Sequence, residues 1–278
     1  MFINKKIIKI SFPNLIFWVI AILITSIFGL ILGDILWHGV RGLSWEFLLS
    51  EPLKAGREGG IAPILVSTLL ILLVTLAVSL PFGVGTAIFL AEFTNHQNLF
   101  GRLIRRSLDI LAGVPSIVFG LFGNAFFSIK LGLGFSILSG GLTLACMVLP
   151  ILIRTTEEGL RAVSLDYRLG AAALGISHRS TLWKLLLPSA ISSLMVGLVL
   201  GIGRAIAETA ALIFTSGYVT RMPQSLSDSG RSLSVHIFDL TMNVAGGDQN
   251  AYTSALVLLI LLLIINLSAN FIAKKISH

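Results

Sequence analysis

Six long runs of apolar residues without a single charge constrain the fold of this chain more than any other feature. A helix needs about 20 apolar residues to cross the roughly 30 Å hydrocarbon core of a bilayer. The runs lack the apolar–polar alternation of membrane β-strands. We therefore expect an all-α integral membrane fold with six transmembrane helices, at residues 15–33, 61–91, 110–129, 131–153, 185–203 and 251–273, the fifth continuing to about residue 215.

The overall composition excludes several classes of protein. Apolar residues make up 55% of the chain and charged residues only 12%, with a mean hydropathy of +0.94. A soluble protein of this size would expose apolar patches that aggregate. A soluble, disordered or nucleic-acid-binding protein is thus excluded, despite a net charge of +7. The lone Cys146 allows neither an internal disulfide framework nor a CxxC metal site, and we predict no metal ligands.

The distribution of lysine and arginine predicts the orientation of the six spans. With the N-terminus inside, 13 of the 20 basic residues fall in cytoplasmic segments and 6 in outer segments, while Arg204 alone lies within a span. Basic residues concentrate on the cytoplasmic side of membrane proteins. We expect both termini in the cytoplasm. Residues 1–60 would form the cytoplasmic N-terminus, the first helix and an outer loop. Residues 61–273 would form a core of five helices with a cytoplasmic loop at about 154–184, and residues 274–278 would form a cytoplasmic tail.

Several motifs of enzymes are absent from the sequence. It contains no G-x-x-x-x-G-K-[ST] segment, so the chain cannot bind and hydrolyse ATP through a P-loop. It also lacks H-E-x-x-H and G-x-S-x-G. We predict no catalytic residue and no cofactor in this chain, and favour a transporter or channel subunit over an intramembrane enzyme. Uphill transport would then need an ion gradient or a partner that supplies energy.

The loop at 154–184 carries signals for two short helices. Ser164 can cap the first helix and Ser177 the second, and Gly175 can take the left-handed conformation that ends a helix. Ala171, Ala172 and Ala173 leave the first helix with little side-chain bulk. Such a helix suits insertion into a groove of a partner. The alternative is an interfacial helix pair that only connects two spans.

The same loop resembles the coupling loop of binding-protein-dependent ABC importer permeases, whose pattern is E-A-A-x-x-x-G-x9-I-x-L-P. Leu169 and Gly170 depart from the pattern, and the matching residues are Ala171, Gly175, Leu185, Leu187 and Pro188. In that family this loop forms the coupling helices that dock on the ATP-binding subunit. The resemblance implies that Ala171, Ala172, Ala173, Gly175, Leu187 and Pro188 couple this chain to an ATPase.

Four further segments, at 111–123, 147–158, 203–211 and 230–237, look like the permease subunits of phosphate ABC importers. This resemblance implies the type I ABC importer permease architecture in a bacterial plasma membrane. It implies half of a translocation path for phosphate, shared with a second, related permease as a heterodimer. It also implies a cytoplasmic ATP-binding subunit dimer, which would bind ATP and Mg, and an extracytoplasmic phosphate-binding protein. The alternatives are a permease for sulfate or molybdate and an anion carrier that needs no ATPase.

Arg204 and Glu208 are the two charged residues inside the extended fifth run. They lie four residues apart, so on one helix their side chains can meet. A charge near the bilayer centre costs about 2.5–3.5 kcal/mol and is normally paired or turned inward. One interpretation is a structural clamp between helices. The other, which the resemblance favours, is that Arg204 offers its guanidinium to a passing oxyanion and Glu208 neutralises the empty site.

Overall fold

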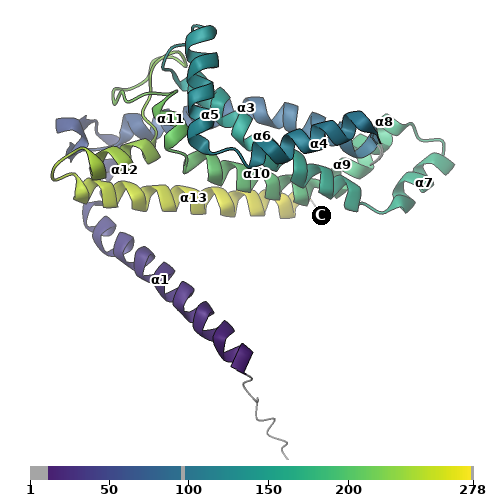
Figure 1. Cartoon of the computed structure of the whole chain (residues 1–278), viewed down its shortest axis with the longest axis horizontal. Helices are drawn as coiled ribbons and strands as arrows, with labels where there is room; N and C mark the ends of the chain where they lie inside the picture. The colour runs from purple at the N-terminus through teal and green to yellow at the C-terminus, as the bar shows by residue number, and fades with distance from the viewer. Residues whose placement is uncertain (1–11, 95–97, 277–278) are drawn as a thin grey trace, which may run out of the picture.

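The computed structural model describes residues 12–94 and 98–276, and this part of the chain is almost entirely helical (Figure 1). The predicted cytoplasmic segment before residue 12 and the last two residues of the predicted tail lie outside the described residues. Four helices are long and apolar enough to cross a membrane unbroken: α1 (Phe12–Gly42), α3 (Ala62–Glu92), α6 (Ile137–Ala162) and α13 (Asp248–Ile276). Two bent helix pairs bring the number of candidate spans to the six that the sequence predicts.

The first bent pair covers the predicted span at 110–129. α4 (Leu99–Ala112) stops just before Pro115, and α5 (Ser116–Gly123) with η2 (Asn124–Lys130) then leaves at 104° to it. Proline cannot donate the backbone hydrogen bond of a helix interior, and it disfavours helical geometry in the residue before it. Figure 1 shows α5 rising almost perpendicular to the long axis of the bundle. The predicted span at 110–129 is thus part of a bent pair that begins at Leu99.

The second bent pair corresponds to the fifth predicted span. Its first part consists of α8 (His178–Thr181), η3 (Leu182–Leu186) and α9 (Leu187–Ser189), and α10 (Ile191–Ile206) follows at 63° to it. The predicted continuation to about residue 215 is interrupted, because α10 ends at Ile206 and α11 (Ala210–Ile213) starts a new helix. On the N-terminal side of the loop at 154–184, α6 continues to Ala162, past the predicted end of the fourth span at residue 153.

The core of the bundle lies where α3, α6, α10 and α11 meet. Its centre consists of buried aliphatic side chains from all four helices, among them Ile71, Val74, Leu144, Met147, Val148, Ile202, Ala205 and Leu212. Thr75 in the core bonds to the backbone: its hydroxyl donates to the Ile71 carbonyl at 2.8 Å and lies 3.2 Å from the Gly141 carbonyl. Since lipid tails are as apolar as these side chains, close packing and such hydrogen bonds hold the helices together.

Small residues bring α10 directly against α6. A Cβ atom on Gly197 would collide with the hydroxyl of Thr155, and one on Gly201 would lie 2.6 Å from Val148. The side chain of Ser193 occupies the equivalent place against Gly159 one turn earlier. The row of small residues on α10 is thus a surface that contacts α6.

Apart from α1, the long helices run side by side between two distinct ends of the bundle (Figure 1). One end, which we call the α7 end, carries α7 (Leu165–Ala173) and α8. The other, the α12 end, carries α12 (Leu233–Met242), α2 (Trp45–Leu49) and a small hairpin of β1 (Pro52–Leu53), η1 (Lys54–Gly56) and β2 (Glu58–Gly59). The hairpin strands pair antiparallel, with Pro52 opposite Gly59.

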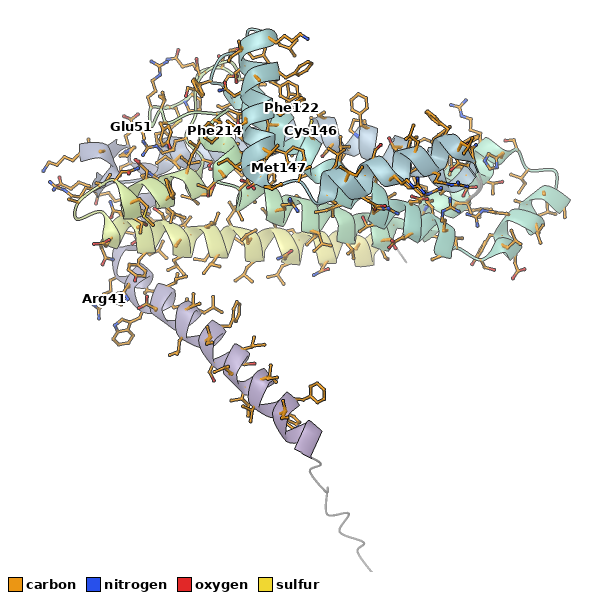
Figure 2. All side chains as sticks on the ribbon, in the orientation of Figure 1. Arg41, Glu51, Phe122, Cys146, Met147 and Phe214 are labelled. Carbon is orange, nitrogen blue, oxygen red and sulfur yellow. The ribbon has the colours of Figure 1, made fainter. Side chains whose placement is uncertain are left out.

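Helix α1 joins the bundle only at the α12 end. There Gly39 and Gly42 lie close to Leu256 and Thr253 of α13, and Tyr252 donates to Asp34 at 2.9 Å. Beyond this contact the side chains of α1 stand clear of the other helices (Figure 2). The most apolar stretch of α1 is not buried by the rest of the chain. The apolar surface of α1 is therefore available to lipid or to another subunit.

Candidate functional site

Arg204 and Glu208 lie on opposite sides of the point where α10 ends. Residues 207–209 form a turn between α10 and α11, and the Glu208 carboxylate accepts the backbone N–H of Ala211 at 3.1 Å. The Ser234 hydroxyl donates to the Glu208 carbonyl, which ties this turn to α12. The expectation that Arg204 and Glu208 share one helical turn is wrong. The carboxylate instead satisfies one of the free N–H groups at the start of α11.

The guanidinium of Arg204 has no ion pair and no hydrogen bond to any residue in 12–94 or 98–276. Its side chain is half-buried, and one turn before it on the same side of α10 Leu200 is 53% exposed. A side chain added at the neighbouring Gly203 would meet open space. Arg204 thus borders a surface that this chain leaves uncovered, with five N–H donors that can bind an oxyanion.

The residues of the predicted coupling loop lie where the sequence predicts two short helices. Ser164 accepts the N–H of Asp166 at the start of α7, and Ser177 accepts the N–H of Ser180 at the start of α8. Gly175 has φ +70° between them. The N–H groups of Ile176 and Gly175 bond to the carbonyls of Ala171 and Ala172, a Schellman motif. These local predictions are confirmed.

The surface of this loop combines small and apolar side chains. Ala171 is buried, whereas Ala172 and Ala173 are exposed, and Leu174 at the corner is 78% exposed. Leu187 and Pro188 form the start of α9, just before the 63° bend into α10. An exposed leucine beside alanines is a surface that another protein can cover.

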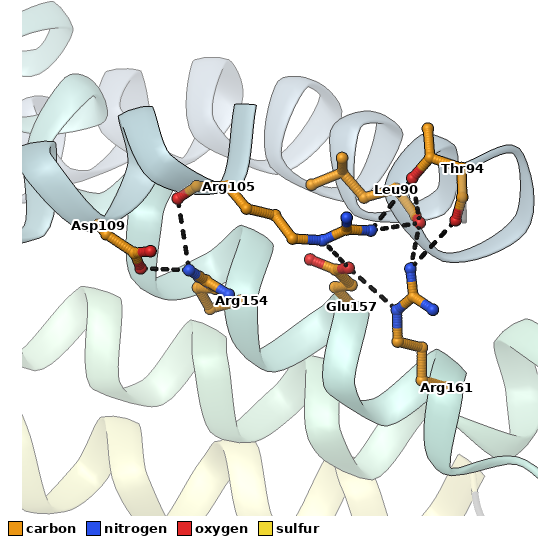
Figure 3. Close-up of polar contacts among 7 residues, drawn as sticks. All are labelled: Leu90, Thr94, Arg105, Asp109, Arg154, Glu157 and Arg161. Atoms are coloured by element: carbon orange, nitrogen blue, oxygen red, sulfur yellow. Dashed lines mark hydrogen bonds and ion pairs between the residues drawn. The ribbon is translucent and has the colours of Figure 1, made fainter. Parts of the chain in front are cut away.

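A network of charged side chains connects three helices near the α7 end (Figure 3). The carboxylate of Glu157 on α6 accepts Arg105 Nε of α4 at 2.8 Å and Arg161 Nε at 3.0 Å. Both guanidinium groups also donate to the Leu90 carbonyl in the last turn of α3, at 3.1 and 2.6 Å. The Glu157 side chain is only 5% exposed. The arginines thus neutralise a buried carboxylate and cap the carboxyl end of α3.

Thr94 completes this network, and a second ion pair extends it along α4. Arg105 donates to the Thr94 hydroxyl at 3.1 Å, and Arg154 pairs with Asp109 one turn further along α4. The sequence signalled only part of this arrangement. Glu157 and Arg161 show the i, i+4 spacing of a helical ion pair, but nothing in the sequence relates Arg105 to Glu157, 52 residues away.

A separate buried cluster fixes the structure at the α12 end. Arg231 pairs with Asp239 at 2.8 Å, donates to the Tyr218 carbonyl at 3.0 Å and lies over the Tyr218 ring. His236 is completely buried, with Nδ1 3.5 Å from Arg231 Nη1. Burial first, and the charge of Arg231 second, lower the pKa of His236 to about 4. Arg231 and His236 are buried and contact other groups of this chain, so the cluster is structural.

Two other kinds of site can be assessed from the geometry. Within residues 12–94 and 98–276, no three His, Cys, Asp or Glu side chains are grouped closely enough to hold a metal ion. A pocket of about 440 Å³ lies in the corner between α4, α5 and α6, beside Phe122 and Cys146 (Figure 2). Its lining is apolar, with Leu108, Phe119 and Ile153 among its walls. Such a pocket gives a hydrated anion no hydrogen-bond partner.

Comparison with solved structures establishes the fold. A chain of the MetNI methionine ABC transporter, from a structure in inward-facing conformations, superposes with a TM-score of 0.58 at 15% identity, covering 88% of this chain and 99% of that one. Together with the membrane-spanning helices, this defines the class of the protein: a multi-pass membrane protein with the type I ABC importer permease fold.

Comparison with protein families and known sequences identifies the chain within that class. Residues 83–278 match the family model described as "Binding-protein-dependent transport system inner membrane component", and the chain belongs to this family of ABC transporter permeases, which are non-catalytic membrane subunits. It is 32% identical to "Probable ABC transporter permease protein YqgI" of Bacillus subtilis, over 94% of this chain and 93% of that protein. It is 35% identical to "Phosphate transport system permease protein PstA homolog" of Mycoplasma pneumoniae, over 88% of this chain but 39% of that longer protein.

Proposed function

We propose that this chain is a membrane permease subunit of a phosphate ABC importer and forms half of the translocation path for inorganic phosphate. The observation that carries the proposal is the set of relatives named phosphate transport system permease, which match most of the chain. The segments at 111–123, 147–158 and 203–211 resemble the same permeases. ATP hydrolysis in a separate subunit would drive transport.

The proposed complex assigns a partner to each end of the bundle. The α7 end, with the basic residues of the predicted inner loops, would face the cytoplasm and dock on a dimer of ATP-binding subunits, which hold ATP and Mg. The α12 end would receive phosphate from an extracytoplasmic binding protein. A second, PstC-like permease would pair with this chain as a heterodimer and complete the path within the bacterial plasma membrane.

Phosphate uptake tests this proposal directly. Cells or proteoliposomes with the full complex should take up phosphate when ATP is present, and a partner ATPase unable to hydrolyse ATP should abolish uptake. Excess sulfate or molybdate should leave phosphate uptake unchanged. Uptake of sulfate or molybdate without uptake of phosphate would favour a permease for another oxyanion. Phosphate uptake that does not depend on the ATPase would favour a carrier.

Within this function we propose that Arg204 contacts the translocated anion. A planar guanidinium can donate two parallel hydrogen bonds to a phosphate, and that of Arg204 is not engaged by the described residues. Glu208 would serve translocation by holding the turn that follows Arg204, through its bond to Ala211. A clamp formed by an Arg204–Glu208 ion pair is the weaker alternative, since the helix ends between the two residues.

Substitutions separate these two roles. Arg204→Gln should assemble normally and lose phosphate uptake, and Arg204→Lys should transport poorly because an ammonium cannot form the bidentate contact. A clamp predicts instead that either Arg204→Gln or Glu208→Gln damages assembly and that the double variant restores both assembly and uptake. The measurement is phosphate uptake normalised to assembled complex. Near-normal uptake in the double variant would reject a contact between Arg204 and the anion.

A further inference from the structure

Arg168 attaches helix α7 to the ends of two core helices. Its guanidinium donates to both carboxylate oxygens of Glu92, at the carboxyl end of α3, with Nη2–Oε1 2.7 Å and Nε–Oε2 3.4 Å. The same group donates to the Leu160 carbonyl at 3.0 Å and the Val163 carbonyl at 2.9 Å, at the carboxyl end of α6. One side chain therefore joins α7, α3 and α6.

The burial of this contact makes it a firm attachment. The Glu92 side chain is 3% exposed and that of Arg168 25%. A buried carboxylate that loses its partner remains as an uncompensated charge, so the pair resists separation. A two-point guanidinium–carboxylate contact also fixes the relative orientation of the two groups, which a single hydrogen bond does not.

The second short helix leans on the same end of α3. His178 Nε2 of α8 lies 4.0 Å from Glu92 Oε2, and the His178 ring packs edge-on against Phe93 at 5.5 Å. In contrast, Ala172 and Ala173 of α7 are exposed. Helix α7 thus has little side-chain packing of its own, and the contacts of Arg168 account for much of its attachment to the bundle.

We propose that the Arg168–Glu92 pair is the positioning contact that transmits movement of the coupling helix to α3 and α6. This rests on the proposed function, in which an ATP-binding subunit moves α7. Because Arg168 contacts the last turns of both α3 and α6, displacement of α7 displaces the ends of the two helices that pack along the centre of the molecule. Without the pair, α7 can follow the ATPase while the end of α3 stays behind, and only the two-residue connection to α6 still carries the movement.

The test is the amount of phosphate transported per ATP hydrolysed by the full complex in proteoliposomes with the binding protein. Arg168→Gln should assemble, keep an ATPase rate near that of the wild type, and lower this ratio about fivefold or more, the size of a typical coupling between two sites. Glu92→Gln keeps the length and one acceptor oxygen of the side chain, and it should also lower the phosphate transported per ATP hydrolysed. If Arg168→Gln does not assemble, the ratio measured for Glu92→Gln tests the proposal alone. The control is Arg106→Gln, which removes an exposed arginine of α4 at the same end of the bundle.

A covalent replacement distinguishes transmission from a merely structural role. Arg168→Cys with Glu92→Cys, in a Cys146→Ser background, should be uncoupled after assembly and regain the wild-type ratio when a short bifunctional thiol reagent bridges the two cysteines. An unchanged ratio in both single variants, or a bridged variant that stays uncoupled, would overturn the proposal. If the wild-type complex does not transport phosphate at all, the proposed function fails, and that result is distinct from a failure of the Arg168–Glu92 proposal.

Discussion

Glu157 provides the sharpest quantitative prediction, because its partners and burial define what each substitution removes. One oxygen of its carboxylate accepts hydrogen bonds from Arg105 and Arg161, while the other has no partner among residues 12–94 and 98–276. Glu157→Gln keeps the shape and the accepting oxygen but removes the charge, so each bond loses about 1 kcal/mol and the total is about 2 kcal/mol. Glu157→Leu also removes the acceptor and leaves two guanidinium groups without their counter-charge, a loss of about 3–5 kcal/mol.

The side-chain exposures support the larger value for the leucine variant. Arg105 and Arg161 are 12% and 28% exposed, so water replaces the lost carboxylate only in part. Glu158, the next residue, offers a matched control because its side chain is exposed. Glu158→Gln and Glu158→Leu should change stability by no more than about 0.5 kcal/mol.

The measurement is the resistance of the purified chain in detergent to unfolding, followed as the loss of helical circular dichroism during titration with sodium dodecyl sulfate. The order of stability should be wild type, then Glu157→Gln, then Glu157→Leu, with both Glu158 variants close to wild type. Equal stability of Glu157→Leu and Glu158→Leu would refute the reasoning. It would mean that the two arginines find sufficient solvation or other acceptors when Glu157 is removed.

Substitutions at three further positions test the glycine corner of the loop, the predicted topology and the buried histidine. Gly175→Val should insert into the membrane but lose co-purification with the ATP-binding subunit and stop uptake, because φ +70° strains a β-branched residue by about 1–3 kcal/mol. Gly33→Val adds the same side chain at an ordinary helical position of α1 with free space, outside the proposed docking loop, so it should retain both properties. Asp166→Cys in a Cys146→Ser background should not react with a membrane-impermeant thiol reagent added outside intact cells, but should react after permeabilisation. Labelling in intact cells would contradict the predicted cytoplasmic position of this loop. Since the folded state holds His236 neutral with a pKa of about 4, its contribution to stability is present above pH 6.5 and should fall as the pH drops towards 4, by up to about 1.4 kcal/mol per unit. His236→Gln should remove that part of the pH dependence, and an identical pH profile in the variant would contradict it.

Local signals in the sequence determined where the candidate membrane-spanning helices lie and the form of the loop at 154–184. A run of about 20 apolar residues can only be accommodated in lipid as a helix, whatever its neighbours. The caps at Ser164 and Ser177 and the positive φ of Gly175 likewise depend on a few adjacent residues. Such features follow from the sequence because their energies arise within one or two helical turns.

Only the tertiary structure decided the path of the helices and the partners of their charges. Hydropathy cannot distinguish a straight helix from the 104° bend before Pro115, because both keep the same residues in an apolar environment. The Glu208 carboxylate could pair with Arg204 or accept the free N–H of Ala211. Because α10 ends at Ile206, before Glu208, the carboxylate accepts the Ala211 N–H. The Arg168–Glu92 pair spans 76 residues of sequence, and no local rule relates them. They meet because the ends of α3 and α6 pack together, and a buried carboxylate there requires an opposite charge.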